Sequence, residues 1–224
     1  MTPLAQGCLA ENAWLCGDYV RTRSEEILSA SQQHVFLTVV SVALGFAIAF
    51  PVALLARRFR AEGAVLGVTT GLYTVPSLAL FGLLLPFTGL GVPTVIIALV
   101  IYSLTILVRN VIAGLEGVPE DVRESARGMG FGPVRQLFSV ELPLALPAVF
   151  AGLRIATVST VALVTVGALI GAGGLGNLIY EGLNSVFRAQ VLTASALCVV
   201  IAVAADLLLL GVQRMLTPWQ RGVQ

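Results

Sequence analysis

Few residues of this chain are of the types that carry out chemistry, and their spacing assembles no catalytic group. His34 is the only histidine, and no Ser or Cys nucleophile stands with a histidine and an acid in a spacing typical of a triad. No set of His, Cys, Asp and Glu has the spacing of metal ligands, and no carboxylates are paired for acid–base work. We therefore expect no catalytic residue, no metal site and no cofactor.

One glycine-rich segment matches a cofactor-binding pattern. Residues 171–176, GAGGLG, fit the dinucleotide fingerprint G-x-G-x-x-G letter for letter. That fingerprint binds a pyrophosphate where it joins a strand to a helix in a βαβ unit, whereas here it follows a long apolar segment. We reject nucleotide binding on this ground. The chain also has no Walker A sequence and hence no ATP site of the usual kind.

The composition indicates a membrane protein. Hydrophobic residues make up 57% of the 224 residues and charged residues 11%, and the mean hydropathy is +0.94. A soluble domain carries about 25% charged residues. A membrane-spanning helix needs about 20 apolar residues, and five segments qualify: 35–56, 64–85, 92–112, 146–170 and 191–212. The sequence therefore predicts an all-α integral membrane protein with about five transmembrane helices and with its termini on opposite sides.

A polar stretch lies between the third and the fourth apolar segment. Pro119 suits the first turn of a helix, where its missing N–H has no partner to lose. Gly130 would end that helix, because glycine adopts the left-handed conformation without a steric penalty. Pro133 would then begin a second helix, which Leu142 and Pro143 would end. We expect a compact pair of helices that projects from the membrane protein and suits docking on a partner.

The same stretch resembles the EAA signature of bacterial ABC transporter permeases: Glu-Ala-Ala, three residues, Gly, nine residues, Ile, one residue, Leu-Pro. The residues that match it are Glu124, Ser125, Ala126, Gly130, Val140, Leu142 and Pro143. Every spacing is kept, and the only departures are Ser for the first Ala and Val for Ile. In that family this cassette is the coupling helix, which docks in a groove of the cytoplasmic ATPase. The resemblance implies that Glu124 pairs with a basic residue of the ATPase and that Ala126 permits close approach.

Further stretches are similar to the osmoprotectant subgroup of these permeases, and the similarity covers most of the chain from about residue 33 to 218. They are Gln33 and His34, residues 76–80, residues 108–110, residues 142–154 and residues 169–176. The resemblance implies a methionine-importer-like type I permease core and the import of glycine betaine, carnitine or choline. Another small solute such as methionine is the alternative within the family.

The resemblance also implies the partners. They are a dimer of cytoplasmic ABC ATPases, a second permease of the same or a similar chain, and an extracytoplasmic solute-binding protein. ATP hydrolysis is expected on the separate ATPase, so that this chain is not itself an enzyme. The net charge of +1 and the spread of arginines along the membrane edges give no indication of a nucleic acid partner.

A stand-alone secondary transporter or channel is the alternative from another class. Such proteins usually carry inverted repeats and buried charges along an ion path. We see no repeat, and Asp206 is the only acid well inside an expected span. Such an acid faces a partner or water, and its place near the inner end of the span favours water. A membrane enzyme would need a polar catalytic cluster. Neither rival accounts for the EAA spacing.

Polar residues within the second and third apolar segments are candidates for the translocation path. Proline breaks the helical hydrogen-bond ladder, and a kink with hydroxyl groups facing inward would suit such a path. A purely structural kink and an ordinary packing aromatic are the alternatives. The residues concerned are Tyr73, Thr74, Pro76, Ser77 and Tyr102.

The glycines of residues 171–176 have two interpretations. The family resemblance implies that they form a flexible turn in an external gate, and the alternative is close helix packing. The residues concerned are Gly171, Gly173, Gly174 and Gly176.

The arginines predict the orientation, since the chain has no lysine. With the cassette in the cytoplasm, ten arginines lie in inside segments and three, Arg21, Arg23 and Arg188, lie outside. We therefore expect a multi-pass protein of the bacterial inner membrane, with the N-terminus outside and the C-terminus in the cytoplasm. The chain divides into an extracytoplasmic lead-in (1–33), a transmembrane domain (34–216, coupling loop about 114–145) and a cytoplasmic tail (217–224).

The lead-in is too polar for a signal peptide. Cys8 and Cys16 would lie on the oxidising side of the membrane, where a disulfide can form. A disulfide and two free thiols are the alternatives for this pair. His34 would be an interfacial residue just before the first span, and Cys198 a small packing residue within the last span.

Overall fold

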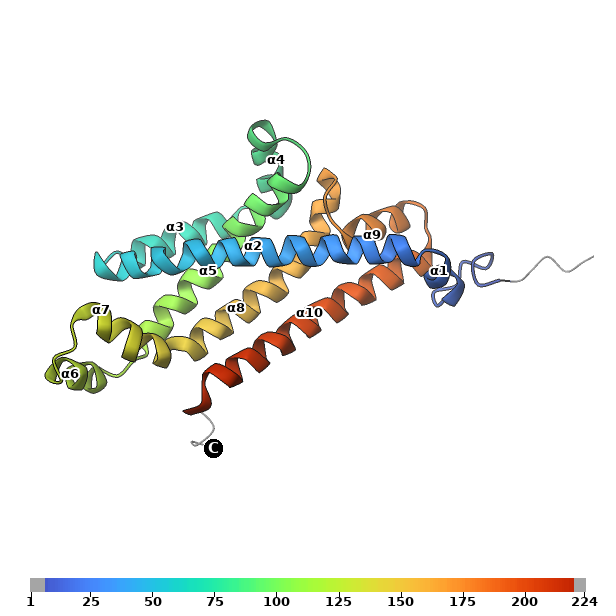
Figure 1. Cartoon of the computed structure of the whole chain (residues 1–224). Coiled ribbons are helices and arrows are strands. Elements are labelled where there is room, and N and C mark those ends of the chain that lie inside the picture. The colour runs from blue at the N-terminus through green and yellow to red at the C-terminus, as the bar shows by residue number, and fades with distance from the viewer. Residues whose placement is uncertain (1–6, 220–224) are drawn as a thin grey trace, which may run out of the picture. The chain divides into compact units, whose positions relative to one another are not determined.

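The computed structural model describes residues 7–219, and this part of the chain is helical apart from short connections (Figure 1). A π-helical turn at Leu137–Glu141 joins α7 to α8, and a 3₁₀ segment at Thr165–Ile170 follows α8. The α-helices are α1 Gly17–Thr22, α2 Ser24–Arg58, α3 Glu62–Thr74, α4 Ser77–Thr88, α5 Val92–Glu116, α6 Glu120–Gly128, α7 Pro133–Gln136, α8 Leu142–Val164, α9 Leu175–Asn184 and α10 Arg188–Leu216.

Four helical segments are long and apolar enough to cross a membrane: Ser24–Arg58, Val92–Glu116, Pro133–Ile170 and Arg188–Leu216. The second apolar segment of the sequence is instead two helices, α3 and α4, bent by 95° at a short break. By length and composition, the described residues thus hold four helices that could span a membrane, or five spans if the bent pair counts as one. The all-α membrane fold is confirmed, and the number of spans depends on this pair.

The break between α3 and α4 lies where the sequence predicts a kink. Pro76 directly precedes α4, so that its missing N–H interrupts no helical hydrogen bond of that helix. The hydroxyl of Thr74 donates to the carbonyl of Gly71 at 2.7 Å, which satisfies one of the last carbonyls of α3. The predicted kink is confirmed, and it is sharper than a bend within one helix.

Two helix ends differ from the prediction. The first long helix begins at Ser24 rather than near residue 35, with Glu25 and Glu26 in its first turn, where acids complement the helix dipole. The second cassette helix does not end at Leu142 and Pro143, because α7 runs through the π-helical turn into α8. A π turn displaces the carbonyl that a proline ring would otherwise meet, which accommodates Pro143.

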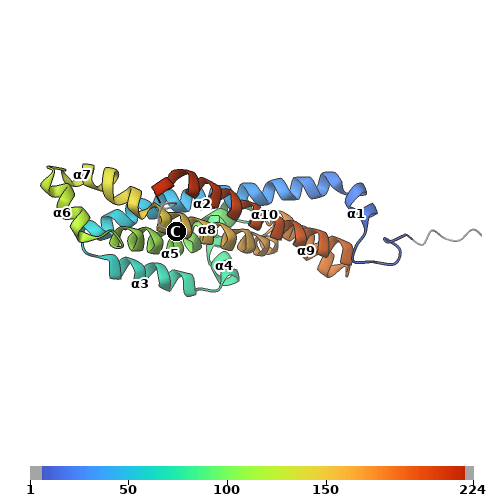
Figure 2. The same cartoon turned by 90° about the horizontal axis from the view of Figure 1, so that it is seen from below.

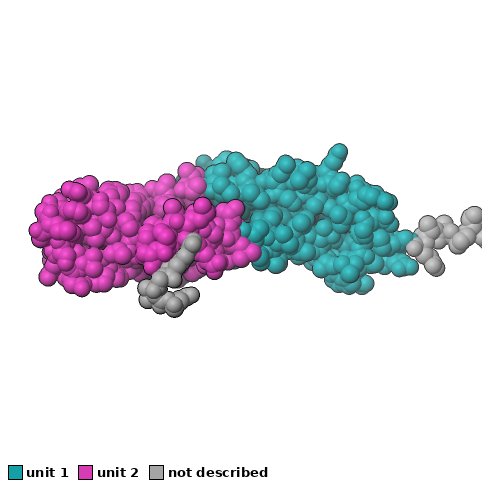
Figure 3. Space-filling view, turned by 60° about the horizontal axis from the view of Figure 1, so that its bottom comes forward, with its two compact units in different colours: residues 1–41, 75–99, 158–204 teal, residues 42–74, 100–157, 205–224 magenta. Residues whose placement is uncertain are grey.

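The chain forms two compact units, and α2, α5, α8 and α10 contribute residues to both (Figure 3). Unit 1 contains residues 1–41, 75–99 and 158–204, and unit 2 contains residues 42–74, 100–157 and 205–224. Residues 1–6 of the predicted lead-in and residues 220–224 of the predicted tail lie outside the described residues.

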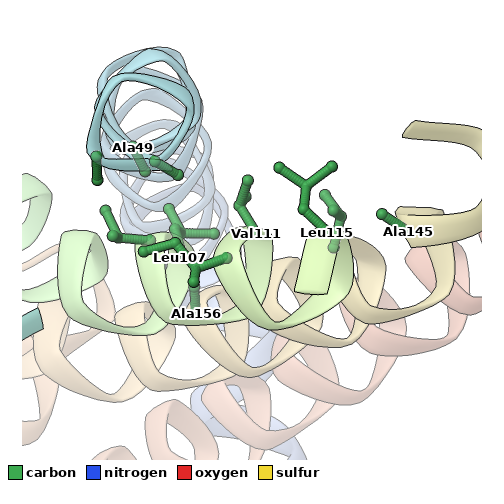
Figure 4. Packing of buried hydrophobic residues seen from close by; sticks show 11 residues of the cluster. Ala49, Leu107, Val111, Leu115, Ala145 and Ala156 are labelled. Carbon is green, nitrogen blue, oxygen red and sulfur yellow. The ribbon is translucent and has the colours of Figure 1, made fainter. Parts of the chain in front are cut away.

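The core of unit 2 consists of small and branched apolar side chains from α2, α5 and α8 (Figure 4). Small residues let helix backbones approach closely, and the resulting van der Waals packing stabilises the association of helices in a bilayer. At Gly114 an added Cβ would lie 3.0 Å from the carbonyl oxygen of Ala145, so that α5 and α8 nearly touch there. The buried residues labelled in the figure are Ala49, Leu107, Val111, Leu115, Ala145 and Ala156.

In unit 1 the N-terminal segment packs on the connection between α9 and α10. The ring of Tyr19 meets that of Phe187 edge to face at 5.2 Å. Asn12 donates to the carbonyl of Val186 at 2.7 Å and accepts from the backbone N–H of Arg188 at 2.9 Å. Cys8 and Cys16 form a disulfide, with their Cα atoms 5.4 Å apart. Of the two states that the sequence left open, the structure has the disulfide.

Candidate functional site

The cassette that the EAA spacing marks is built of α6 and α7, which lie side by side (Figure 2). Pro119 stands immediately before α6 and Pro133 begins α7. Gly130 has φ +79°, and its N–H donates to the carbonyl of Arg127 at 2.9 Å as the chain leaves the helix. The predicted pair of short helices joined at a left-handed glycine is therefore confirmed.

The cassette exposes apolar side chains as well as charges. Met129 is 68% exposed, Val134 70% and Phe138 54%, next to the exposed polar residues Glu124 and Ser125. Exposed apolar side chains on an otherwise polar loop are typical of a protein interface. Sequence reasoning missed these three side chains, although they stand at intervals of four and five residues through the motif.

Ala126 does not lie on this surface. It is only 1% exposed. Its side chain therefore packs within the chain, and the expectation that Ala126 permits close approach to a partner stays a prediction. Of the other motif residues, Val140, Leu142 and Pro143 are half-buried where the cassette joins α8, and Gly130 is exposed.

Charged groups on α6 are arranged in pairs. The carboxylate of Glu120 accepts from Arg123 at 3.0 Å and also from Arg127. These hydrogen bonds from Arg123 and Arg127 hold the pKa of the exposed Glu120 below its ordinary value. The guanidinium of Arg135 lies 4.3 Å from the ring centre of Phe131, a cation–π contact that orders the start of α7.

One buried acid beside the motif was missed by sequence reasoning. Glu141 lies in the π-helical turn directly before Leu142 and Pro143 and is 5% exposed. The signal that could have found it is a single charged residue where the polar stretch passes into an apolar helix. Such a residue needs compensating partners.

The structure brings together two of the residues predicted for the translocation path. The rings of Tyr73 and Tyr102 meet edge to face with centres 5.7 Å apart, Tyr73 being exposed and Tyr102 buried. Thr74 ends α3 and Ser77 begins α4, on either side of Pro76. Their part in a path stays a prediction.

Gly171, Gly173 and Gly174 lie between the 3₁₀ segment and α9, and Gly176 lies in the first turn of α9; all but the exposed Gly171 are buried. A Cβ on Gly174 would lie 2.7 Å from the backbone N of His34, and a Cβ on Gly173 or Gly176 would meet the backbone of the preceding 3₁₀ segment. Gly171 has φ +83° and open space around it. These contacts correspond to close packing rather than a loose turn, and the gate role stays a prediction.

His34 is fully buried instead of lying at an interface. Its Nε2 is 3.0 Å from the carbonyl oxygen of Val161 in α8. Of the two alternatives for Asp206, the structure has the partner: its carboxylate accepts two hydrogen bonds of 2.7 Å each from Arg154. Among residues 7–219, no three His, Cys, Asp or Glu side chains gather closely enough to hold a metal ion.

Comparison with known proteins gives a family and several relatives. Residues 41–222 match the family described as binding-protein-dependent transport system inner membrane component. The chain is 36% identical over 202 residues to the carnitine transport permease protein OpuCB of Listeria monocytogenes, covering 89% of this chain and 92% of that one. It is 33% identical over 201 residues to the choline transport system permease protein OpuBB of Bacillus subtilis, covering 89% and 93%.

A third relative and two solved structures extend the comparison. The osmoprotectant import permease protein OsmW of Salmonella typhimurium is 35% identical over 206 residues, covering 89% of this chain and 96% of that one. The inward-facing MetNI methionine ABC transporter has a chain with a TM-score of 0.76 at 25% identity, over 85% of this chain and 96% of that one. A bacterial alginate ABC transporter in complex with a periplasmic protein shares the fold, with a TM-score of 0.71 at 16% identity.

Proposed function

Since the chain belongs to the family of binding-protein-dependent transport system inner membrane components, we propose that it is the permease of an ATP-driven importer of osmoprotectants. It forms the translocation path, and it couples to a separate ATPase through α6 and α7. The single observation that carries the coupling role is the projecting cassette, which combines the EAA spacing with the exposed apolar residues Met129, Val134 and Phe138.

The proposed mechanism is a movement of the cassette that switches the spans between two states. ATP binding closes the ATPase dimer, and the ATPases push the cassettes of two permeases, which are identical or similar chains. The spans then change from inward-facing to outward-facing, a transition that needs a rigid link at the docking site. Glu124, exposed on α6, is available to pair with a basic residue of the ATPase.

The relatives' names support the substrate class. They are permeases named for choline, carnitine and osmoprotectant transport, and glycine betaine, carnitine and choline share a quaternary ammonium group. Aromatic rings attract such cations. In the described part of unit 2 the ring pair Tyr73 and Tyr102 offers one exposed ring, which is less than a closed cage. We therefore assign most of the specificity to an extracytoplasmic solute-binding protein.

The experiment is uptake of labelled glycine betaine by cells that lack other betaine importers. They express this chain with its ATPase and its solute-binding protein, and each component is omitted in turn. Uptake that requires all three supports the proposal. Uptake by this chain alone would favour a stand-alone transporter. If the full set takes up methionine instead of betaine, the permease role holds and the substrate class is replaced.

A further inference from the structure

The buried carboxylate of Glu141 joins three elements of unit 2. It accepts a hydrogen bond from the guanidinium of Arg57, in the last turn of α2, and another of 2.8 Å from the side-chain amide of Gln136 in α7. The Nε atom of Arg123 in α6 lies 3.8 Å from the same carboxylate, within ion-pair range. Helices α2, α6 and α7 thus share one acidic group.

Burial makes this group sensitive to the loss of a partner. A carboxylate removed from water is stable only if charges and hydrogen bonds replace its hydration. The side chain of Glu141 is 6% exposed, that of Arg123 16% and that of Arg57 30%. Charge-assisted hydrogen bonds are directional, so they hold one geometry where apolar contacts would allow sliding.

The contacts continue to a second long helix. Arg123 also donates to the carbonyl of Leu115 near the end of α5. The same arginine therefore connects α6 to α5, while Glu141 connects the cassette to α2. A movement imposed on α6 and α7 has a polar connection to the ends of two long helices.

We propose that Glu141 is a positioning residue that links the docking cassette to the end of α2, through Arg57, so that displacement of α6 and α7 moves the first long helix. The inference rests on the proposed coupling role of the cassette. Glu141 itself lies too deep to touch an ATPase, and its role is to transmit the movement. Energetic coupling of this kind requires packed or hydrogen-bonded elements with two arrangements.

The test compares glycine betaine uptake with ATP hydrolysis in proteoliposomes that hold the permease, its ATPase and its binding protein. Glu141→Gln removes the acidic charge and keeps a similar side-chain volume, and Arg57→Gln removes the basic charge with a shorter side chain. We expect both to lower the uptake per ATP hydrolysed by about fivefold or more, the size of a typical coupling between sites, while ATPase binding persists. The double variant is expected to be no worse than either single one, because both changes break the same contact.

Two controls separate transmission from loss of structure. Glu62→Gln makes the same chemical change at the half-buried first turn of α3, outside the cassette, and should leave the ratio unchanged. Arg57→Lys keeps the charge and should restore most of the coupling. If Glu141→Gln fails to insert into the membrane, Arg57→Gln still tests the link. The side chain of Arg57 is partly exposed, so its replacement leaves less buried surface uncompensated.

A change in the cassette itself, Gly130→Asp, is expected to uncouple uptake from ATP hydrolysis. If it does so while Glu141→Gln and Arg57→Gln leave the uptake per ATP hydrolysed unchanged, the link is overturned and the proposed function stays intact. Uptake and hydrolysis that fall together, with less assembled complex, would also overturn it, because Glu141 would then only stabilise the fold. Failure of the proposed function is distinguishable, since the unmodified permease would then show no ATP-driven betaine uptake.

Discussion

Gly130 and Gly174 both have positive φ, but their surroundings differ. Gly130 has φ +79° with nothing within 4 Å of a Cβ, so that only its backbone conformation resists substitution. Gly174 has φ +53° and packs against the backbone of His34. The first position is therefore open to a partner protein, whereas the second is occupied by the chain itself.

Gly130→Asp is expected to uncouple transport while the protein still inserts and folds. It adds a negative charge at the exposed end of α6, beside the proposed docking surface, while aspartate itself tolerates the left-handed region. The measurement is betaine uptake together with stimulation of the ATPase by the assembled complex. Gly130→Asn is the matched control, because asparagine is of similar size, carries no charge and tolerates the left-handed region. Stimulation in Gly130→Asp equal to that of the unmodified protein would contradict the docking assignment.

Gly174→Ala is expected to destabilise the fold more than Gly171→Ala. Gly171 lies in the left-handed region, where alanine costs about 1–2 kcal/mol of backbone strain. Gly174, with φ +53° and ψ −121°, lies outside the regions that L-residues adopt, so alanine is strained at least as much there. Only Gly174 adds a clash, with the backbone N of His34 at 2.7 Å, for which overpacking costs about 1–3 kcal/mol more. Thermal unfolding of the purified protein in detergent measures the difference. Equal unfolding temperatures would mean that the segment relaxes easily, as a loose gate would.

At the scale of elements, Arg154 in α8 and Asp206 in α10 form a bidentate pair within the apolar helices. Removing one partner leaves the other charge without compensation, whereas replacing both by apolar residues of similar volume is often harmless. Asp206→Asn and Arg154→Met are each expected to lower the yield of folded protein and its unfolding temperature. The double variant Arg154→Met with Asp206→Leu is expected to recover both. If the double variant folds well but transports nothing, the pair serves transport rather than stability.

The sequence predicts the elements better than the contacts between them. The length of an apolar segment is a local signal, and it predicted the four long helices. The positions of proline and glycine are local signals too, and they predicted the break near Pro76 and the turn at Gly130. The partners of Glu141 and Asp206 did not follow, because an apolar helix gives no sign of its rotation about its axis. The burial of Ala126 and His34 has the same origin: which face packs depends on residues far away along the chain.

At the scale of the whole molecule, the bent pair α3 and α4 determines the topology. If the pair crosses the bilayer, the chain has five spans and its termini lie on opposite sides. If it turns back within the bilayer, there are four spans and the termini lie on the same side. Only the first arrangement agrees with the hydrogen bond between Arg57 and Glu141, which places the end of α2 at the cassette. The positive-inside count also favours it, because Arg57, Arg58 and Arg60 then lie on the side of the cassette.

The disulfide between Cys8 and Cys16 agrees with an N-terminus outside, since such bonds persist in oxidising compartments. Mass spectrometry of protein alkylated before reduction is expected to find both cysteines protected and Cys198 free. Reduction should loosen the N-terminal segment from the α9–α10 connection, because the bridge closes the loop that carries Asn12. Two alkylated thiols in freshly isolated membranes would contradict an oxidising location.

Single cysteines on either side of the bent pair test the topology directly. In a Cys198→Ala background, Phe59→Cys precedes α3 and Leu90→Cys follows α4, at positions that are 71% and 74% exposed. We expect a membrane-impermeant maleimide to label Leu90→Cys in intact spheroplasts and Phe59→Cys only after permeabilisation, because a spanning pair places them on opposite sides. The native disulfide does not react with maleimide. Labelling of both cysteines only after permeabilisation would make α3 and α4 a re-entrant pair. The N-terminus and the cassette would then both lie outside. A cassette outside cannot dock on a cytoplasmic ATPase, so this result would contradict the proposed function.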